Sequence, residues 1–266
     1  MLGAIIGDIV GSRFEFDDEK VKDFILFSDD CFFTDDSVMS LAIAKVIIEC
    51  KNDYSNLSAA TIKYMQNIGR KYPDCGYGGS FYHWLFHHDA PKPYNSYGNG
   101  AAMRVSACAW AGKTLEEVKL LSKKVTEISH NHEEGLKGAE ATTISIFMAL
   151  QGKTISEIRE YINDNYYDLD FTLDEIRNDY KFDETCQGTV PQAITAFLES
   201  TSFEDAIRKA ISIGGDSDTI AAITGSIAEA YYGVPEDIRE KALTYLDDQL
   251  KQILLDFEKI YFPKIL

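Results

Sequence analysis

Basic residues are scarce in this sequence. Its 266 residues include 26 Lys and Arg against 43 Asp and Glu, which gives a formal net charge of −17. A surface with this balance has no basic stripe that could replace the counterions of a nucleic acid. We therefore expect no nucleic-acid partner, and some of the acidic side chains are candidates for cation binding.

Long apolar runs are also missing. No uninterrupted apolar segment approaches the roughly 20 residues that a membrane-spanning helix needs. The first residues carry no basic region, and Asp8 interrupts their apolar run, so no secretory signal peptide is expected. The sequence thus predicts a soluble cytoplasmic protein without a membrane partner.

Cysteine is sparse and shows no pairing pattern. The number of cysteines is odd, and none belongs to a C-x-x-C pair. This usage is typical of reduced intracellular thiols and argues against a disulfide framework or a zinc site. The five residues are Cys31, Cys50, Cys75, Cys108 and Cys186.

The signature loops of several enzyme classes are absent. The chain contains no Walker loop, no G-x-S-x-G elbow and no dinucleotide-binding fingerprint. His83, His87, His88 and Asp89 resemble a fragment of a His-Asp metal phosphohydrolase site, but no matching set of residues follows downstream. A metal-dependent nucleotide phosphohydrolase is therefore kept only as an alternative.

Helical patterns fill most of the chain. No run alternates with the period of a strand, and there is no low-complexity linker, tandem repeat or break in composition. We expect one all-α domain spanning residues 1–266. The predicted helices cover residues 1–12, 34 to about 47, 57–69, 80–86, about 104–111, 114–128, 133–150, 154–161, 189–199, 202–211, 219–232 and 235–262. Residues 165–188 are predicted to form a polar loop with one short helix.

Two of these helix starts carry paired carboxylates. Gly214 to Thr219 reads Gly-Gly-Asp-Ser-Asp-Thr, and Thr34-Asp35-Asp36-Ser37 also precedes an apolar helical run. Taken alone, Asp218 could be only a helix N-cap. If the two starts meet, however, four carboxylates crowd together and need protons or cations between them. Carboxylate and hydroxyl oxygens select hard cations such as Mg²⁺, Mn²⁺ or Ca²⁺, and this number of ligands favours a two-metal site.

Small residues suggest further functional contacts. Gly3, Gly7 and Gly11 repeat every four residues, which would let another element approach the first helix closely. Gly98-Asn99-Gly100 before a helix favours an anion cradle of backbone N–H groups, although Asn-Gly is also a common turn. His130 and His132 could line a site or simply lie at a helix end.

Taken together, these motifs resemble the ADP-ribosylglycohydrolase family. The resemblance spans residues 3 to 233 and keeps the family order of motifs. Ser37 stands where threonine is more usual in the first metal motif. The similar segments are Gly7-Asp8…Gly11…Glu15, Thr34 to Met39, Gly98 to Arg104, Ser129-His130 and Gly214 to Thr219.

The resemblance implies an all-α fold with metal ions at the base of a cleft. The implied activity is the removal of ADP-ribose from an ADP-ribosylated protein or small molecule by cleavage at the ribose anomeric carbon. Two Mg²⁺ or Mn²⁺ ions would be held by Thr34, Asp35, Asp36, Asp216, Asp218 and Thr219. The substrate would be bound by Gly98, Asn99, Gly100, Met103 and His130.

Chemistry at the anomeric carbon needs a proton for the leaving group and an activated water. We hypothesise that Asp216 or a metal-held water is the base and that Glu15 is the proton donor. A catalytically weak relative that only binds ADP-ribose or neutralises a toxin remains an alternative. The sequence leaves open the group that carries the ADP-ribose and the role of residues 165–188, and it gives a monomer as the default.

Overall fold

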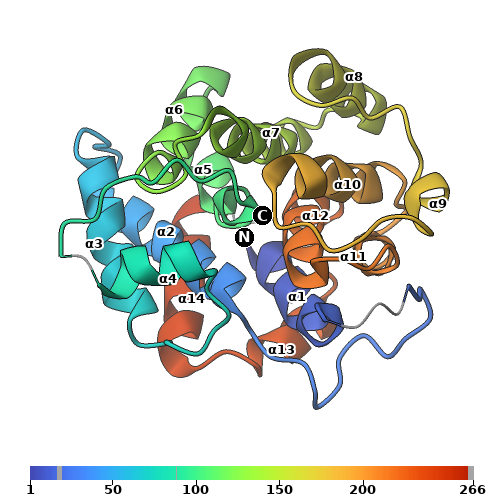
Figure 1. Cartoon of the computed structure of the whole chain (residues 1–266), viewed down its shortest axis with the longest axis horizontal. Helices are drawn as coiled ribbons and strands as arrows, with labels where there is room; N and C mark the ends of the chain where they lie inside the picture. The colour runs from blue at the N-terminus through green and yellow to red at the C-terminus, as the bar shows by residue number, and fades with distance from the viewer. Residues whose placement is uncertain (17–19, 88, 263–266) are drawn as a thin grey trace.

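Helices follow one another through almost the whole chain (Figure 1). The computed structural model describes residues 1–16, 20–87 and 89–262. No strand occurs among these residues, and their only extended pairing is an isolated bridge between Gly98 and Thr185. The predicted all-α fold is therefore confirmed. None of the described helices is long and apolar enough to cross a lipid bilayer.

The described residues form fourteen α-helices and two short 3-10 helices. Most of their ends lie within about four residues of the positions that the sequence pattern predicts. The α-helices are α1 (Leu2–Gly11), α2 (Asp35–Cys50), α3 (Leu57–Gly69), α4 (Gly79–Phe86), α5 (Ser106–Ala111), α6 (Leu115–Thr126), α7 (Glu133–Leu150), α8 (Ile155–Asn165), α9 (Leu173–Ile176), α10 (Cys186–Leu198), α11 (Phe203–Ile211), α12 (Ser217–Tyr232), α13 (Glu236–Leu243) and α14 (Asp248–Tyr261). The 3-10 helices are η1 (Ser12–Phe14) and η2 (Asn99–Ala101).

The start of α10 differs from the sequence-based prediction. The pattern predicts a start near Thr189 with Pro191 in the first turn, but the helix begins at Cys186. Thr185 is the N-cap residue, because its side-chain oxygen accepts the Gly188 N–H at 3.1 Å. Pro191 consequently lies inside the helix, where its missing N–H removes one backbone hydrogen bond.

Helix α12 lies at the centre of the fold. It packs against α1, α7, α10 and α11, while α2 packs against α1, α3, α5 and α14 (Figure 1). Most of α12 is buried, and its side chains belong to one cluster of apolar residues that runs through the described chain. A helix surrounded in this way gives a rigid support to whatever its first turn carries.

Glycines let the backbone of α1 touch the backbone of α12. A Cβ atom added to Gly7 would lie 2.0 Å from the carbonyl oxygen of Ala221, and one added to Gly3 would lie 2.1 Å from that of Gly225. The close approach that the glycine spacing predicted is therefore confirmed.

Helices α1 and α12 are antiparallel, because residues later in α1 contact residues earlier in α12. Gly11, at the end of α1, meets the start of α12, where an added Cβ would lie 2.5 Å from the Cα atom of Asp218. This packing brings Glu15, just after η1, to the first turn of α12.

We expect Gly7→Ala to lower the free energy of unfolding by about 3 kcal/mol, because the new methyl group overlaps the α12 backbone and forces the helices apart. Urea denaturation would measure the loss. Gly79→Ala is the matched control, since an added Cβ at that position meets nothing within 4 Å. Equal stability of the two variants would contradict the close packing of α1 on α12.

Candidate active site

The starts of α2 and α12 border one cavity of about 500 Å³. Its wall also includes residues from Gly76 to Phe81 and from Tyr94 to Arg104, together with His130 and the loop around Glu184. Every residue to which the sequence analysis gave a metal-binding, catalytic or substrate-binding role lines this cavity except Thr34. The residues from that set are Glu15, Asp35, Asp36, Gly98, Asn99, Gly100, Met103, His130, Asp216, Asp218 and Thr219.

The two helix starts meet directly. Asp36, in the first turn of α2, accepts a hydrogen bond from the Thr219 hydroxyl at 3.2 Å through Oδ2. Its other oxygen, Oδ1, is buried and has no hydrogen-bond partner in the described structure. A buried carboxylate oxygen without a donor is expensive to leave alone, which makes it a natural ligand for a cation.

The start of α12 lies two residues earlier than the sequence predicts. The helix begins at Ser217 rather than Thr219, so Asp216 is the N-cap residue and Asp218 lies in the first turn. The Asp216 side chain does not cap the helix. It accepts a hydrogen bond from Asn99 Nδ2 at 2.6 Å instead, which ties the cradle segment to the carboxylate cluster.

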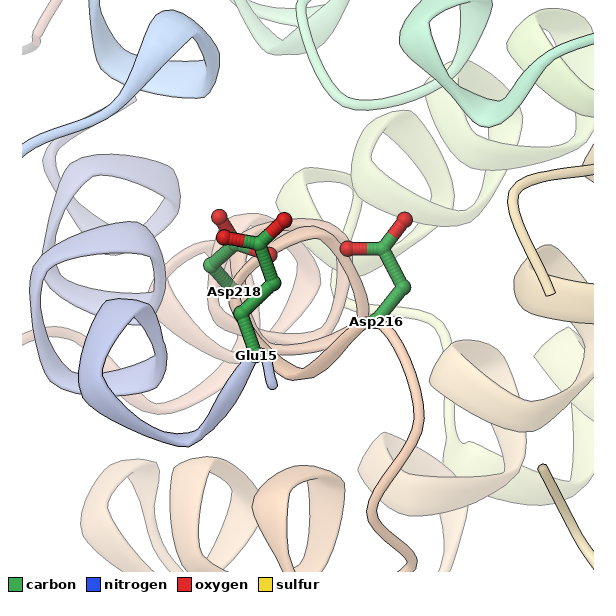
Figure 2. Close-up of side chains that lie close together, drawn as sticks. All are labelled: Glu15, Asp216 and Asp218. Atoms are coloured by element: carbon green, nitrogen blue, oxygen red, sulfur yellow. The ribbon is translucent and has the colours of Figure 1, made fainter. Parts of the chain in front are cut away.

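Glu15 joins this cluster. Carboxylate oxygens of Glu15, Asp216 and Asp218 lie within 4.8 Å of one another, a spacing that one cation could bridge. Figure 2 shows the three carboxyl groups gathered beside the start of α12, with Glu15 arriving from the end of α1. The sequence analysis proposed Glu15 as the proton donor, and in the structure Glu15 lies close to two of the predicted metal ligands, Asp216 and Asp218.

Burial governs the charge state of the cluster. Burial, and then neighbouring carboxylates, raise the pKa values of Asp35, Asp36 and Asp218 well above the ordinary aspartate value. The pKa of Glu15 is raised to about 7 by burial and by the charges of Asp216, Asp8 and Glu184. Without cations, such a cluster keeps protons at neutral pH, and cations can take the place of those protons. The oxygen-only donor set suits Mg²⁺ or Mn²⁺.

Asp8 is a buried residue that the sequence analysis left without a role. It accepts hydrogen bonds from the backbone N–H of Thr34 and Ser37 and from both of their hydroxyl groups. Burial raises its pKa to about 6 although these bonds lower it. Asp8 therefore attaches α1 to the start of α2, and the one acidic residue in an apolar glycine-rich helix was the available signal.

Thr34 caps α2 and turns away from the cavity. Its side-chain oxygen accepts the Asp36 N–H at 3.3 Å, as the predicted N-cap requires, and donates to Asp8 at 2.6 Å. The proposed contact between Thr34 and a metal ion stays a prediction.

The glycine cradle, Gly98 to Gly100, lines the same cavity as the starts of α2 and α12. The backbone N–H of Asn99 donates to the carbonyl oxygen of Glu184 at 2.7 Å, and Asn99 Nδ2 also donates to Thr189 at 3.1 Å. A Cβ atom on Gly100 would lie 3.4 Å from His130 Nε2, in van der Waals contact, so a side chain there would occupy the space that this ring nitrogen faces. The space that the glycines leave can accept an anionic group.

His130 and His132, which follow α6, lie in different environments. His130 lines the cavity, whereas His132 is the N-cap of α7 and accepts the Glu134 N–H through Nδ1 at 3.1 Å. Of the His-Asp fragment, His83 and His87 lie outside the carboxylate cavity, and His88 lies outside the described residues. The described residues of the fragment therefore add no ligand to this site.

The segment from 165 to 188 reaches the site, a contact that no sequence signal indicated. Tyr180 packs over Gly215, where an added Cβ would lie 2.6 Å from the tyrosine ring. Phe182 stacks on Phe16, with ring centroids 6.1 Å apart. Glu184 then lines the cavity, so this segment forms part of the cavity mouth beside Glu15.

Comparisons with known proteins identify the family of this chain. The family model described as ADP-ribosylglycohydrolase matches residues 1–261. Bovine (Bos taurus) ADP-ribosylhydrolase ARH3 is 26% identical over 333 residues, covering 96% of this chain and 90% of the relative. ADP-ribosylarginine hydrolase Tri1 of Pseudomonas putida (strain GB-1) is 26% identical over 296 residues, covering 96% of this chain and 76% of the relative.

The fold has a solved counterpart. A structure described as an "ADP-ribosylglycohydrolase-related protein complex" superposes with a TM-score of 0.71 at 20% identity, covering 98% of this chain and 96% of that one. At this identity the similarity shows the shared fold alone, while the family model covers nearly the whole sequence. The chain belongs to the ADP-ribosylglycohydrolase family and is a hydrolase of glycosyl bonds.

Proposed function

We propose that this protein uses two divalent cations, Mg²⁺ or Mn²⁺, to release ADP-ribose from a modified target. One observation carries the proposal: the starts of α2 and α12, Glu15 and the glycine cradle all border a single cavity. The names of the relatives support it, since ARH3 is an ADP-ribosylhydrolase and Tri1 acts on ADP-ribosylarginine. We expect the protein to act as a cytoplasmic monomer.

The residues at the two helix starts fit the cations. Asp35, Asp36, Asp216, Asp218 and Thr219 present oxygen atoms to the cavity, and Thr34 lies directly behind them. Bound cations would orient the ribose hydroxyl groups and lower the pKa of a bound water. Their charge would also reduce the repulsion between an anionic substrate and these carboxylates.

The remaining side chains account for the proton transfers. Gly98 and Gly100 leave room for the pyrophosphate, His130 binds it, and the Asn99 side chain holds Asp216 in a fixed orientation through the bond to Oδ2. Asp216 takes the proton of the attacking water. Glu15 gives a proton to the leaving group as the bond to the anomeric carbon breaks; in the metal-free protein, burial and the charges of Asp216, Asp8 and Glu184 raise its pKa to about 7.

The raised pKa values predict how the stability of the metal-free protein depends on pH. The folded-state pKa values of Asp8 (about 6) and Glu15 (about 7) exceed their ordinary values, so the folded state binds protons that the unfolded chain releases. Stability should therefore fall as pH rises from about 4 to about 7. The metal-free protein should be more stable near pH 5 than near pH 8.

Divalent cations should reverse this loss. At about 100 times its Kd, a cation adds roughly 2.7 kcal/mol of stability, which corresponds to about 5 °C in Tm for a chain of this size. The gain should be larger at about pH 8 than at about pH 5, because ligands must lose their protons to bind metal. Thermal unfolding in chelator and in Mg²⁺ at both pH values would measure it, and an equal Tm in all four conditions would contradict the metal assignment.

A substrate panel tests the proposed function. ADP-ribose linked to arginine, to serine, to a nucleobase and as an O-acetyl ester would each be incubated with Mg²⁺, Mn²⁺ or chelator, and the product identified. Release of free ADP-ribose only with metal supports the proposal. Release of phosphate would indicate a nucleotide phosphohydrolase, and calorimetric binding of ADP-ribose without turnover would indicate a binding protein.

A further inference from the structure

Arg104 is a buried cation beside the cavity. Its side chain is wholly buried, and its guanidinium carbon lies 5.3 Å from the centre of the Phe81 ring. The described structure contains no carboxylate in salt-bridge contact with it, and its Nε and Nη1 atoms have no hydrogen-bond partner there. Buried arginines are normally paired, so this one calls for a functional explanation.

The contacts that Arg104 does make converge on His130. Arg104 Nη2 donates to Ser129 Oγ at 2.8 Å and lies 3.4 Å from His130 Nδ1. Ser129 Oγ lies 2.9 Å from the same ring nitrogen. These three groups form a closed set of polar contacts at the cavity wall, which Arg104 and His130 line.

A guanidinium group can only donate hydrogen bonds, and this fact determines the tautomer of His130. Because Ser129 Oγ accepts from Arg104, the hydroxyl hydrogen is free to go to His130 Nδ1. A proton on Nδ1 would place two N–H groups against each other across the contact with Arg104 Nη2. Nδ1 is therefore the acceptor, and the ring proton lies on Nε2.

The Nε2 atom faces the glycine cradle. Cβ atoms added to Gly98 and Gly100 would lie 3.6 Å and 3.4 Å from it. Within the described part of the chain, Nε2 has no hydrogen-bond partner. The backbone N–H groups of Gly98 and Asn99 are already bonded, to Ser96 Oγ at 3.1 Å and to the Glu184 carbonyl oxygen at 2.7 Å. An N–H group on His130 therefore supplies a side-chain donor at the cradle.

We propose that Arg104 is a positioning residue: through Ser129 it holds His130 as the neutral Nε2–H tautomer, which donates a hydrogen bond to a phosphate oxygen in the cradle. The identity of this anion as the pyrophosphate of ADP-ribose rests on the proposed function. Burial and the nearby Arg104 charge keep the pKa of His130 well below its usual range, so the ring stays neutral at neutral pH. The pKa of Arg104 falls only to about 10, so its own charge is retained.

Nitrogen-15 NMR of histidine-labelled protein tests the tautomer without any substrate. The His130 signals would be assigned by their loss in His130→Gln. The wild type should show the Nε2–H form, unchanged between about pH 5 and pH 8. In Arg104→Gln and in Ser129→Ala, the ring should populate both tautomers or begin to titrate. Ser122→Ala is the matched control, because Ser122 is a fully buried serine on α6, away from the cavity wall.

Calorimetry with ADP-ribose then measures the contribution to binding. Arg104→Gln and Ser129→Ala should each weaken binding about tenfold, whereas Ser122→Ala should bind like the wild type and Mg²⁺ affinity should not change. A wild-type Nδ1–H tautomer would overturn the proposal, as would unchanged tautomer and affinity in Ser129→Ala, the variant least able to disturb folding. An Nε2–H wild type that does not bind ADP-ribose would instead refute the proposed function and the identity of the anion.

Discussion

Asp218→Asn should reduce metal-dependent release of ADP-ribose about a thousandfold and, at the same time, stabilise the metal-free protein. Asp218 is buried, and its pKa is raised by burial and by the charges of Asp216 and Asp36. Asparagine keeps the shape and can still accept the Thr219 N–H that Asp218 Oδ1 accepts at 2.8 Å. What it removes is the ionisable group: a cation needs the carboxylate charge, and without a cation the folded state has to hold a proton that the unfolded chain releases at neutral pH.

Asp218→Asn should lower the activity and raise the stability of the metal-free protein, so the two measurements should change in opposite directions. Thermal unfolding in chelator should give a higher Tm for Asp218→Asn than for the wild type. Addition of Mg²⁺ should raise the Tm of the wild type but not that of Asp218→Asn. Asp35→Asn should behave in the same way, since its pKa is raised by the same causes. Asp164→Asn, at an exposed position on α8, is the control and should change neither quantity.

Two outcomes would contradict this interpretation. Full activity of both cluster variants would remove the metal assignment. Lower stability of both variants in chelator would mean that the two carboxyl groups stabilise the metal-free folded protein through hydrogen bonds rather than destabilise it.

Local patterns were enough to predict much of this site. Thr34 at an N-cap followed by Asp35 and Asp36 is information within four residues, and the structure confirms that helix start. The same kind of information placed α12 two residues too late, because it gave Asp218 the N-cap position that Asp216 occupies. The Asp216 carboxylate accepts from Asn99, a residue far away in the chain, and does not cap the helix, so no local capping pattern marks this start.

Residues that act through long-range packing were beyond the reach of the sequence. Asp8 reads as an interruption in an apolar helix, and only the packing of α1 shows that it holds the start of α2. Phe182 and Glu184 belong to a segment whose sequence resembles an ordinary polar loop, yet its path over Gly215 takes it to the cavity mouth. Such contacts depend on how α10 and α12 are placed, which no local pattern specifies.

The packing of α1 on α12 links these observations. Glycines at the interface let the helices touch, and their opposite directions bring the end of one to the start of the other. Asp8 then holds the start of α2 from the same helix, while Glu15 extends over Asp218. One helix thus sets the distance between both carboxylate pairs and the proposed proton donor.

Glu15→Gln should lower kcat by about 10²- to 10⁴-fold and change the affinity for ADP-ribose much less. Glutamine is close to glutamate in size but cannot give a proton to the leaving group. Single-turnover kinetics and calorimetry would measure the two quantities separately. Glu160→Gln, at an exposed position on α8, is the control and should behave like the wild type. An unchanged rate would remove Glu15 from the chemistry.

The proximity of Glu15 to Asp216 and Asp218 raises a second explanation for such a loss, since Glu15 could instead bind a cation. The leaving group separates the two roles. A substrate in which ADP-ribose is linked to a nitrophenol needs no proton on departure, so Glu15→Gln should hydrolyse it at nearly the wild-type rate if Glu15 is an acid. If Glu15 is mainly a ligand, the loss should be equal for good and poor leaving groups, and the variant should bind Mg²⁺ more weakly. Near-normal hydrolysis of the nitrophenyl substrate, with unchanged Mg²⁺ affinity, would therefore establish Glu15 as the proton donor.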